Sequence, residues 1–173
     1  MIKTYIGEYE RYRSIGRKAI DQISDEGLNE ILSAGNNSAA MIVRHISGNF
    51  LSRFTDFLTS DGEKPWRDRD AEFEDARYTR EEVNQMWEEG WHALEAALAE
   101  LSDDDLQKQV IIRGHSLTVD EALARSVAHA AYHVGQIVLL ARILAGDNWQ
   151  WISIPKGKSQ EYLLNPTREK KPD

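Results

Sequence analysis

Two histidines four residues apart, His129 and His133, are the first candidates for chemistry in this sequence. A helix places side chains at i and i+4 on one face, so both imidazoles would lie close enough to share a metal ion. The neighbouring residues are mostly Ala, Val, Leu and Ile, which turns this face toward a protein interior. Buried imidazoles need polar partners, and a divalent cation binds the neutral ring. Taken alone, the pair fits a metal site and two core or surface histidines equally well.

A third histidine, His45, lies in an apolar stretch beside Val43 and Ile46. The polar residues at helical spacing from it are Ser38, Asn49, Ser52 and Asp56. Such a stripe is typical of the wall of a small polar cavity, although a single histidine on a solvated face is the simpler explanation for His45 alone. The case for His92 and His115 as ligands is weaker, because histidine is often exposed or only partly buried.

A site made of His45, His129 and His133 would leave coordination positions open, which is the layout of a catalytic metal site rather than a closed structural one. An open position can hold water or a substrate thiol and lower its pKa. Three imidazoles suit zinc, nickel or ferrous iron, so a divalent metal ion is the expected cofactor.

The loop Asp61 to Asp75 has mixed charge, and its arginines Arg67 and Arg69 alternate with aspartates. Together with Arg53, these arginines fit the bidentate binding of a substrate carboxylate. Ion pairs that hold a long loop in place are the favoured interpretation, because loops with mixed charge are usually solvated.

Three residues near the histidines are candidates for contacts with a substrate: Asn49, Arg53 and Gln136. Gln136 follows His133 by about one helical turn, so it would face the same cavity. The alternative for Gln136 is a hydrogen bond to a neighbouring backbone group.

Four helices are expected to position these residues. Apolar spacing predicts the first over about residues 4–23. Ser38 is the expected N-cap of the second, which runs to about Leu58, and Thr79 with Glu82 forms a capping box for the third, which ends near Leu101. The intervening segment 59–78 is predicted to be a long loop, and a short acidic turn is expected after Ser102.

The segment from Lys108 to Thr118 is expected to form a small β-hairpin around Arg113, Gly114 and His115. Thr118 and Glu121 then form a capping box for the last helix, which Gly146 is expected to end. The whole chain, residues 1–173, is predicted to form one helical domain with a polar tail over about 164–173.

The composition restricts the partners. The formal net charge is −8, which disfavours nucleic acid and anionic membrane surfaces as partners. There are no cysteines, so a metal must bind His, Asp, Glu or water, and any reacting thiol must come from outside. The apolar stretch 134–145 is too short to cross a bilayer, and no signal-peptide layout is present, so the cytoplasm is the expected location.

Longer motifs give a family resemblance over nearly the whole chain, apart from about the last ten residues. The matching stretches are Gly35 to Ser38, Arg44-His45 to Gly48-Asn49, Ser52-Arg53 to Leu58, Asp61 to Asp70, and Ala128-His129 to Tyr132-His133-Val134-Gly135-Gln136-Ile137. With them the chain resembles an uncharacterised bacterial branch of the DinB/YfiT-like superfamily of metalloenzymes. The resemblance implies an all-α antiparallel four-helix bundle, a metal on His45, His129 and His133, and a homodimer.

The superfamily includes transferases and isomerases that use low-molecular-weight thiols, and also proteins described as hydrolases. The resemblance therefore implies a metal-dependent enzyme that transfers such a thiol to a small substrate or hydrolyses one. The alternative is a non-catalytic dimeric metal-binding protein whose site is structural or vestigial. A third possibility, a helical dimerisation module whose histidines bind nothing, is disfavoured by the histidine triad. A site open to solvent would favour the enzyme, and a site sealed by Trp149, Trp151 or the long loop would favour a structural role.

Overall fold

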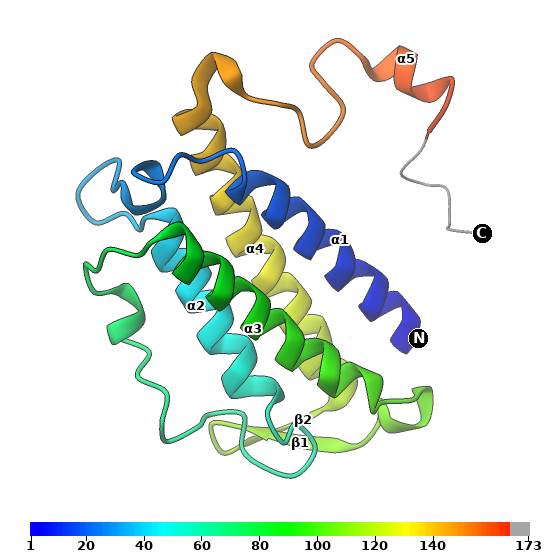
Figure 1. Cartoon of the computed structure of the whole chain (residues 1–173). Helices are drawn as coiled ribbons and strands as arrows, with labels where there is room; N and C mark the ends of the chain where they lie inside the picture. The colour runs from blue at the N-terminus through cyan, green and yellow to red at the C-terminus, as the bar shows by residue number, and fades with distance from the viewer. Residues whose placement is uncertain (167–173) are drawn as a thin grey trace.

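The computed structural model of the chain describes residues 1–166 and is mostly helical (Figure 1). The helices and strands are α1 (Ile2–Ile20), α2 (Ala39–Phe54), α3 (Arg80–Ala99), β1 (Gln109–Ile112), β2 (His115–Thr118), α4 (Val119–Ala145) and α5 (Ser159–Leu163). Short 3-10 turns occupy Gly27–Asn29, Ala71–Phe73, Asp103–Asp105 and Gly146–Asn148. The expected hairpin before the last long helix is confirmed, and a fifth, short helix follows the four that we expected.

Side-chain caps begin three of the long helices where the sequence predicts them. The Ser38 hydroxyl accepts a hydrogen bond from the backbone N–H of Met41, and Thr79 and Thr118 each form a complete capping box. At the other end of α4, Gly146 adopts a φ of 54°, which a glycine reaches without the steric cost of a side chain. These local signals fix the N-termini of the helices that carry the site.

Other boundaries differ from expectation. α2 ends at Phe54 rather than near Leu58, because Thr55 is extended and Asp56 has a φ of 50°, which interrupts a right-handed helix. α1 ends at Ile20, and α5 was not predicted. Of the expected polar tail 164–173, residues 167–173 lie outside the described residues.

The four long helices lie side by side, with α1 and α4 running in one direction and α2 and α3 in the opposite direction (Figure 1). α2 packs mainly against α3, α1 packs mainly against α4, and α2 also contacts α4. The closest pairs are therefore parallel neighbours, because segment 55–79 carries the chain back along α2 before α3 begins. The contact between α2 and α4 brings His45 close to the histidine pair.

The core between these helices is aromatic and closely packed. Trp87, Trp91 and Phe50 are among the largest fully buried side chains. α2 and α3 approach so closely at Gly90 that a Cβ atom there would lie 2.6 Å from the Cα of Ser47. This packing stabilises the scaffold independently of any ligand, because burial of large apolar side chains is the main favourable contribution to folding.

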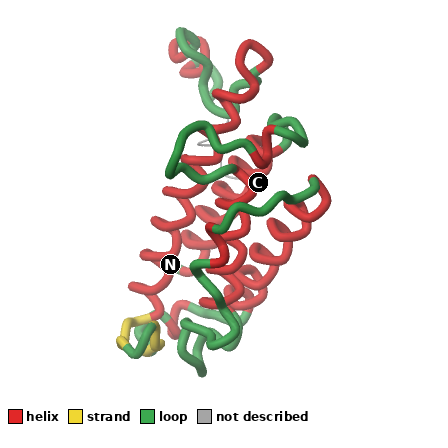
Figure 2. The backbone as a smooth tube through the Cα atoms, turned by 90° about the vertical axis from the view of Figure 1, so that its left-hand side faces the viewer, coloured by secondary structure: helices red, strands yellow, loops and turns green. Residues whose placement is uncertain are grey.

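The hairpin lies at one end of the long helices, where Figure 2 shows it in yellow. Asp61 joins segment 55–79 to the hairpin, because its two carboxylate oxygens accept hydrogen bonds from the backbone N–H groups of Arg113 and Gly114, each at 2.8 Å. The backbone N–H of Gly62 also donates to the carbonyl of Ile111 at 2.8 Å. The long loop is therefore held as a wall beside α2.

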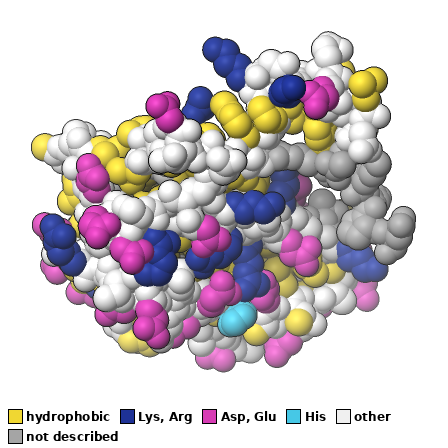
Figure 3. Space-filling model, turned by 45° about the horizontal axis from the view of Figure 1, so that its top comes forward, with side chains coloured by type: hydrophobic (Ala, Val, Ile, Leu, Met, Phe, Trp, Pro, Cys, Tyr) yellow, Lys and Arg dark blue, Asp and Glu magenta, His cyan; other side chains and the backbone are white. Residues whose placement is uncertain are grey.

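One stretch, Val119–Asn148, is long and apolar enough to cross a membrane by length and composition, but a core helix of a soluble protein meets the same test. α4 packs against α1 and α2, and 28% of its most apolar 18-residue window is buried. Basic and acidic side chains are interspersed over the face drawn in Figure 3.

Candidate metal centre

The structure brings together the three histidines that the sequence singled out. His45 comes from α2, and His129 and His133 come from consecutive turns of α4. One ring nitrogen from each lies within 4.8 Å of the others, and the Nε2 atoms of His45 and His129 are 3.1 Å apart. His45 and His133 are buried and His129 is partly buried. Among the described residues, this is the group of His, Asp and Glu side chains placed to hold a metal ion.

Hydrogen bonds orient two of the rings. Glu72 Oε2 lies 2.8 Å from Nδ1 of His45, and Gln136 Oε1 lies 2.8 Å from Nδ1 of His133. Because an ionised carboxylate and an amide oxygen only accept, both histidines donate from Nδ1. In the neutral rings the lone pair is therefore on Nε2, the nitrogen available to a metal, and such outer partners are typical of metal-binding histidines.

His129 has an unsatisfied environment that fits a cation. Its Nδ1 atom is buried, and no described protein group forms a hydrogen bond with it. Its Nε2 faces Nε2 of His45, so two lone pairs would oppose each other unless a proton or a cation lies between them. Burial first, and then the neighbouring His133 and His45, lower the pKa of His129 to about 3. The ring is therefore held neutral, which is the form that binds metals.

Burial also lowers the pKa of His133, and this outweighs the hydrogen bond to Gln136, which acts in the opposite direction. Two of the three rings are thus held as neutral ligands at neutral pH. Together with the facing Nε2 atoms of His45 and His129, this makes the donor set a good fit for zinc, nickel or ferrous iron.

Glu72 is a part of the site that sequence reasoning missed. It lies at the 3-10 turn Ala71–Phe73 and is buried, and Arg67 donates to its Oε1 from Nε at 2.7 Å and to its Oε2 from Nη2 at 3.0 Å. Burial raises the pKa of the Glu72 carboxyl, but hydrogen bonds from His45 and Arg67 outweigh this, so the pKa lies below its usual value. Glu72 is therefore ionised, and it links the loop to the first histidine.

The Glu72 carboxylate reaches His45 across Gly48. Gly48 follows His45 by almost one turn of α2. A Cβ atom at position 48 would lie 2.3 Å from Oε1 of Glu72, much closer than any real contact. The absence of a side chain at Gly48 therefore makes room for the carboxylate. Nothing in the spacing of the histidines could have identified Glu72, because it lies in an irregular segment 27 residues from His45.

A cavity of about 430 Å³ opens beside the histidines. All three histidines line it, and so do the candidate substrate contacts Asn49, Arg53 and Gln136. Exposed residues of α4, Arg125 and Tyr132, form part of its rim. Trp149 and Trp151 are not among the described residues that line it, so these tryptophans do not seal the site.

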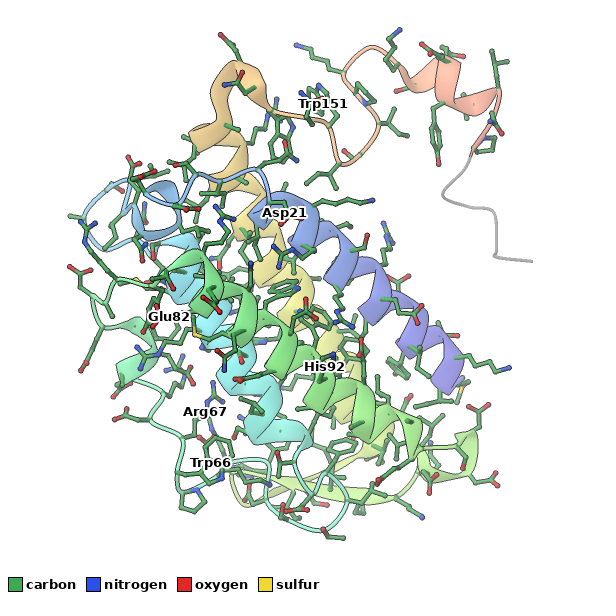
Figure 4. All side chains as sticks on the ribbon, viewed as in Figure 1. Asp21, Trp66, Arg67, Glu82, His92 and Trp151 are labelled. Atoms are coloured by element: carbon green, nitrogen blue, oxygen red, sulfur yellow. The ribbon has the colours of Figure 1, made fainter. Side chains whose placement is uncertain are left out.

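Of the two loop arginines, Arg67 forms an ion pair as the structural interpretation predicts, whereas Arg69 forms none with any described carboxylate. Arg67 pairs with Glu72, and Arg53 pairs with Glu63 at 3.2 Å while also donating to the carbonyl of Gly62. Figure 4 shows Arg67 on the side of segment 55–79 that faces α2. Arg53 and Arg67 also line the cavity, so their structural role leaves contact with a ligand open to them.

The two remaining histidines lie elsewhere. His92 is exposed on α3, where Figure 4 labels it, and His115 is exposed at the start of β2. Neither belongs to the cluster, as their weaker sequence context suggested.

Comparison with known proteins gives one family. A family model described as "Protein of unknown function (DUF1572)" matches residues 1–158, which includes every residue of the histidine cluster and its cavity. No curated protein matches the chain closely enough to count as a relative.

Proposed function

The chain belongs to the DUF1572 family of proteins of unknown function, and from its histidine site we propose that it is a metal-dependent enzyme. In this proposal one divalent ion binds His45, His129 and His133, and the enzyme transfers a low-molecular-weight thiol to a small substrate or hydrolyses one. The observation that carries it is the convergence of three imidazoles, two of them fixed by outer hydrogen bonds, at the wall of an accessible cavity.

The proposed chemistry follows from the donor set. A divalent ion on three imidazoles would keep open positions and would lower the pKa of a coordinated water or thiol. The protein would contribute the orientation of the rings through Glu72 and Gln136, and the cavity would hold the second reactant near them. The accessible rim favours an enzyme over a sealed structural site, because a structural site has no use for room beside the metal.

We also propose that the fold is a four-helix bundle of the DinB/YfiT-like type, in which α1 and α4 run antiparallel to α2 and α3, with residues 1–173 as one domain. The support is the position of one histidine on α2 and an i, i+4 pair on α4, together with the long connection between α2 and α3. The proposal includes a cytoplasmic location, and it includes no nucleic acid or membrane as partner.

The direct test is metal content followed by activity. We expect the purified protein to carry about one divalent metal ion per chain, measured by elemental analysis, because three neutral imidazoles converge on one point. A panel of small electrophiles with added thiols, and a panel of ester and amide substrates, should then reveal turnover that a chelator abolishes and the same metal restores. Protein that takes up no metal after incubation with zinc, nickel or ferrous iron would refute the proposal.

A homodimer is the proposed assembly. Three large apolar side chains of α4 are mostly exposed: Tyr132 at 64%, Leu139 at 60% and Ile143 at 54%. Leu139 follows Tyr132 by seven residues and Ile143 follows Leu139 by four, so all three lie along one side of the helix. Large apolar residues gathered in this way favour association, because their burial is favourable. We expect light scattering at micromolar concentration to give twice the mass of one chain. A monomer under these conditions would contradict this assembly.

A further inference from the structure

The cavity beside the histidines is strongly basic, although the whole chain is acidic. Five arginines line it, and no Asp or Glu is among its described lining residues. The lining arginines are Arg53, Arg67, Arg69, Arg113 and Arg125. The chain as a whole has a formal net charge of −8. The cavity of this acidic protein is therefore locally positive, and such focusing attracts ligands of the opposite sign.

Carboxylates behind the wall neutralise only part of this charge. Glu63 pairs with Arg53 and Arg113, and Glu72 pairs with Arg67. Arg69 and Arg125 form no ion pair with any described carboxylate, although Arg69 lies over the ring of Phe73 at 5.7 Å. Two carboxylates thus pair with three of the five guanidinium groups, and the charges of Arg69 and Arg125 remain with the cavity.

Arg67 provides the most specific observation. Its side chain is only 2% exposed, and its Nε and Nη2 atoms are both engaged by Glu72. Its Nη1 atom is buried, and no described protein group accepts a hydrogen bond from it. A buried guanidinium N–H without an acceptor is costly, and Arg67 lines the cavity, so a ligand there can supply the acceptor.

Part of the remaining wall is apolar. Phe54, Phe57, Phe73 and Ile112 line the same cavity as the arginines. A ligand that fits both parts of the wall has a charged end and an apolar body, as is usual for small-molecule sites.

We propose that the cavity binds a small organic anion, whose carboxylate or phosphate oxygen accepts a hydrogen bond from Arg67 Nη1 and whose apolar body packs against the phenylalanines. Arg69 and Arg125 attract the same anionic group. This inference names the substrate class of the proposed enzyme. Only the reaction rests on the proposed function, because the arginines bind the anion without a metal. Carboxylate and phosphate share the required chemistry, since a guanidinium donates to either.

The experiment titrates the full-length, metal-free protein with benzoate, phenyl phosphate and neutral benzamide, by calorimetry or by NMR. We expect at least one anion to bind about tenfold or more tightly than benzamide, because a charge-assisted hydrogen bond and the excess positive charge act only on the anions. Benzoate and phenyl phosphate, compared with each other, distinguish the two anionic groups.

Variants assign the binding to the arginines. Arg67→Lys keeps the positive charge beside Glu72 but removes the free guanidinium N–H, and we expect about a tenfold loss of affinity. Arg125→Gln removes an unpaired charge at the rim, and we expect about a threefold loss or more. Arg11→Ala is the matched control, because Arg11 is exposed on α1 and does not line the cavity.

The outcomes separate the two proposals. Equal binding of benzamide and both anions overturns the inference, and so does binding that appears only after zinc is added, because the metal would then hold the anion. If Arg67→Lys does not fold, Arg125→Gln and Arg69→Gln decide, and unchanged affinity in both overturns the inference. Protein that binds the anion through these arginines but takes up no metal upholds the inference and refutes the metal-dependent enzyme.

Discussion

His133→Ala is expected to lower the affinity for zinc by about a thousandfold or more, and to leave the protein helical and cooperatively folded. Zinc bound to four protein ligands in small domains has an affinity worth roughly 10–16 kcal/mol, so each ligand contributes several kcal/mol. A loss of about 4 kcal/mol corresponds to a factor of about a thousand. The helices should persist because buried Trp87, Trp91 and Phe50 form a core that involves no metal.

This result separates a catalytic site from a structural one. Circular dichroism and thermal melting of the wild type and of His133→Ala, each with and without chelator, measure the fold, while a competitive chelator measures zinc affinity. Glu72→Gln should give an intermediate loss of about 10- to 100-fold, as expected for an outer partner of a ligating histidine. His92→Ala is the control, because His92 is exposed and outside the cluster. If chelated wild type and His133→Ala both lost most of their helix, the site would be structural.

The metal-free protein is expected to lose stability in acid, beginning near pH 6.5. The unfolded chain binds a proton at His129 near pH 6.5, whereas the folded chain resists protonation of this ring until about pH 3. Stability from His129 is therefore fully present above pH 6.5 and is lost as the pH falls through this window. The lowered pKa of His133 acts in the same direction, and the lowered pKa of Glu72 adds a further loss below its usual range.

The expected loss in the free energy of unfolding is a few kcal/mol. One group can remove at most about 1.4 kcal/mol for each pH unit. Because the His129 ring is partly exposed, solvent screening reduces this to about half. Urea unfolding of metal-free protein at pH 7, 6 and 5 measures the dependence. His129→Gln should flatten it, and His92→Gln should leave it unchanged. Stability that does not vary between pH 7 and pH 5 would show that these rings are not held neutral by the fold.

Local sequence signals predicted the beginnings of the helices well. Ser38, Thr79 and Thr118 act within their own first turn, so a cap can be recognised without knowing the rest of the fold. The end of α2 was harder, since it depends on the backbone conformation of Asp56, a residue with no obvious stop signal. The parallel direction of α2 and α3 follows from the path of segment 55–79, which local periodicity does not describe.

The histidine cluster was predictable because two of its members share one helix face and the third lies in a polar stripe on another apolar helix. The geometry that joins α2 to α4 then brings them together, as the resemblance implied. Glu72 could not be found in this way. Its role depends on Arg67, on a 3-10 turn and on a close approach to α2, and none of these leaves a periodic pattern in the sequence.

The close approach at Gly48 has an evolutionary consequence. A side chain at position 48 and a glutamate at position 72 compete for the same space, so neither position can be replaced freely while the other is kept. A lineage that gained even an alanine at position 48 would lose the carboxylate behind His45, or would have to move it. We therefore expect the two positions to vary together, and a protein that retains the three histidines but has lost this glycine would have to orient its first ligand by another route.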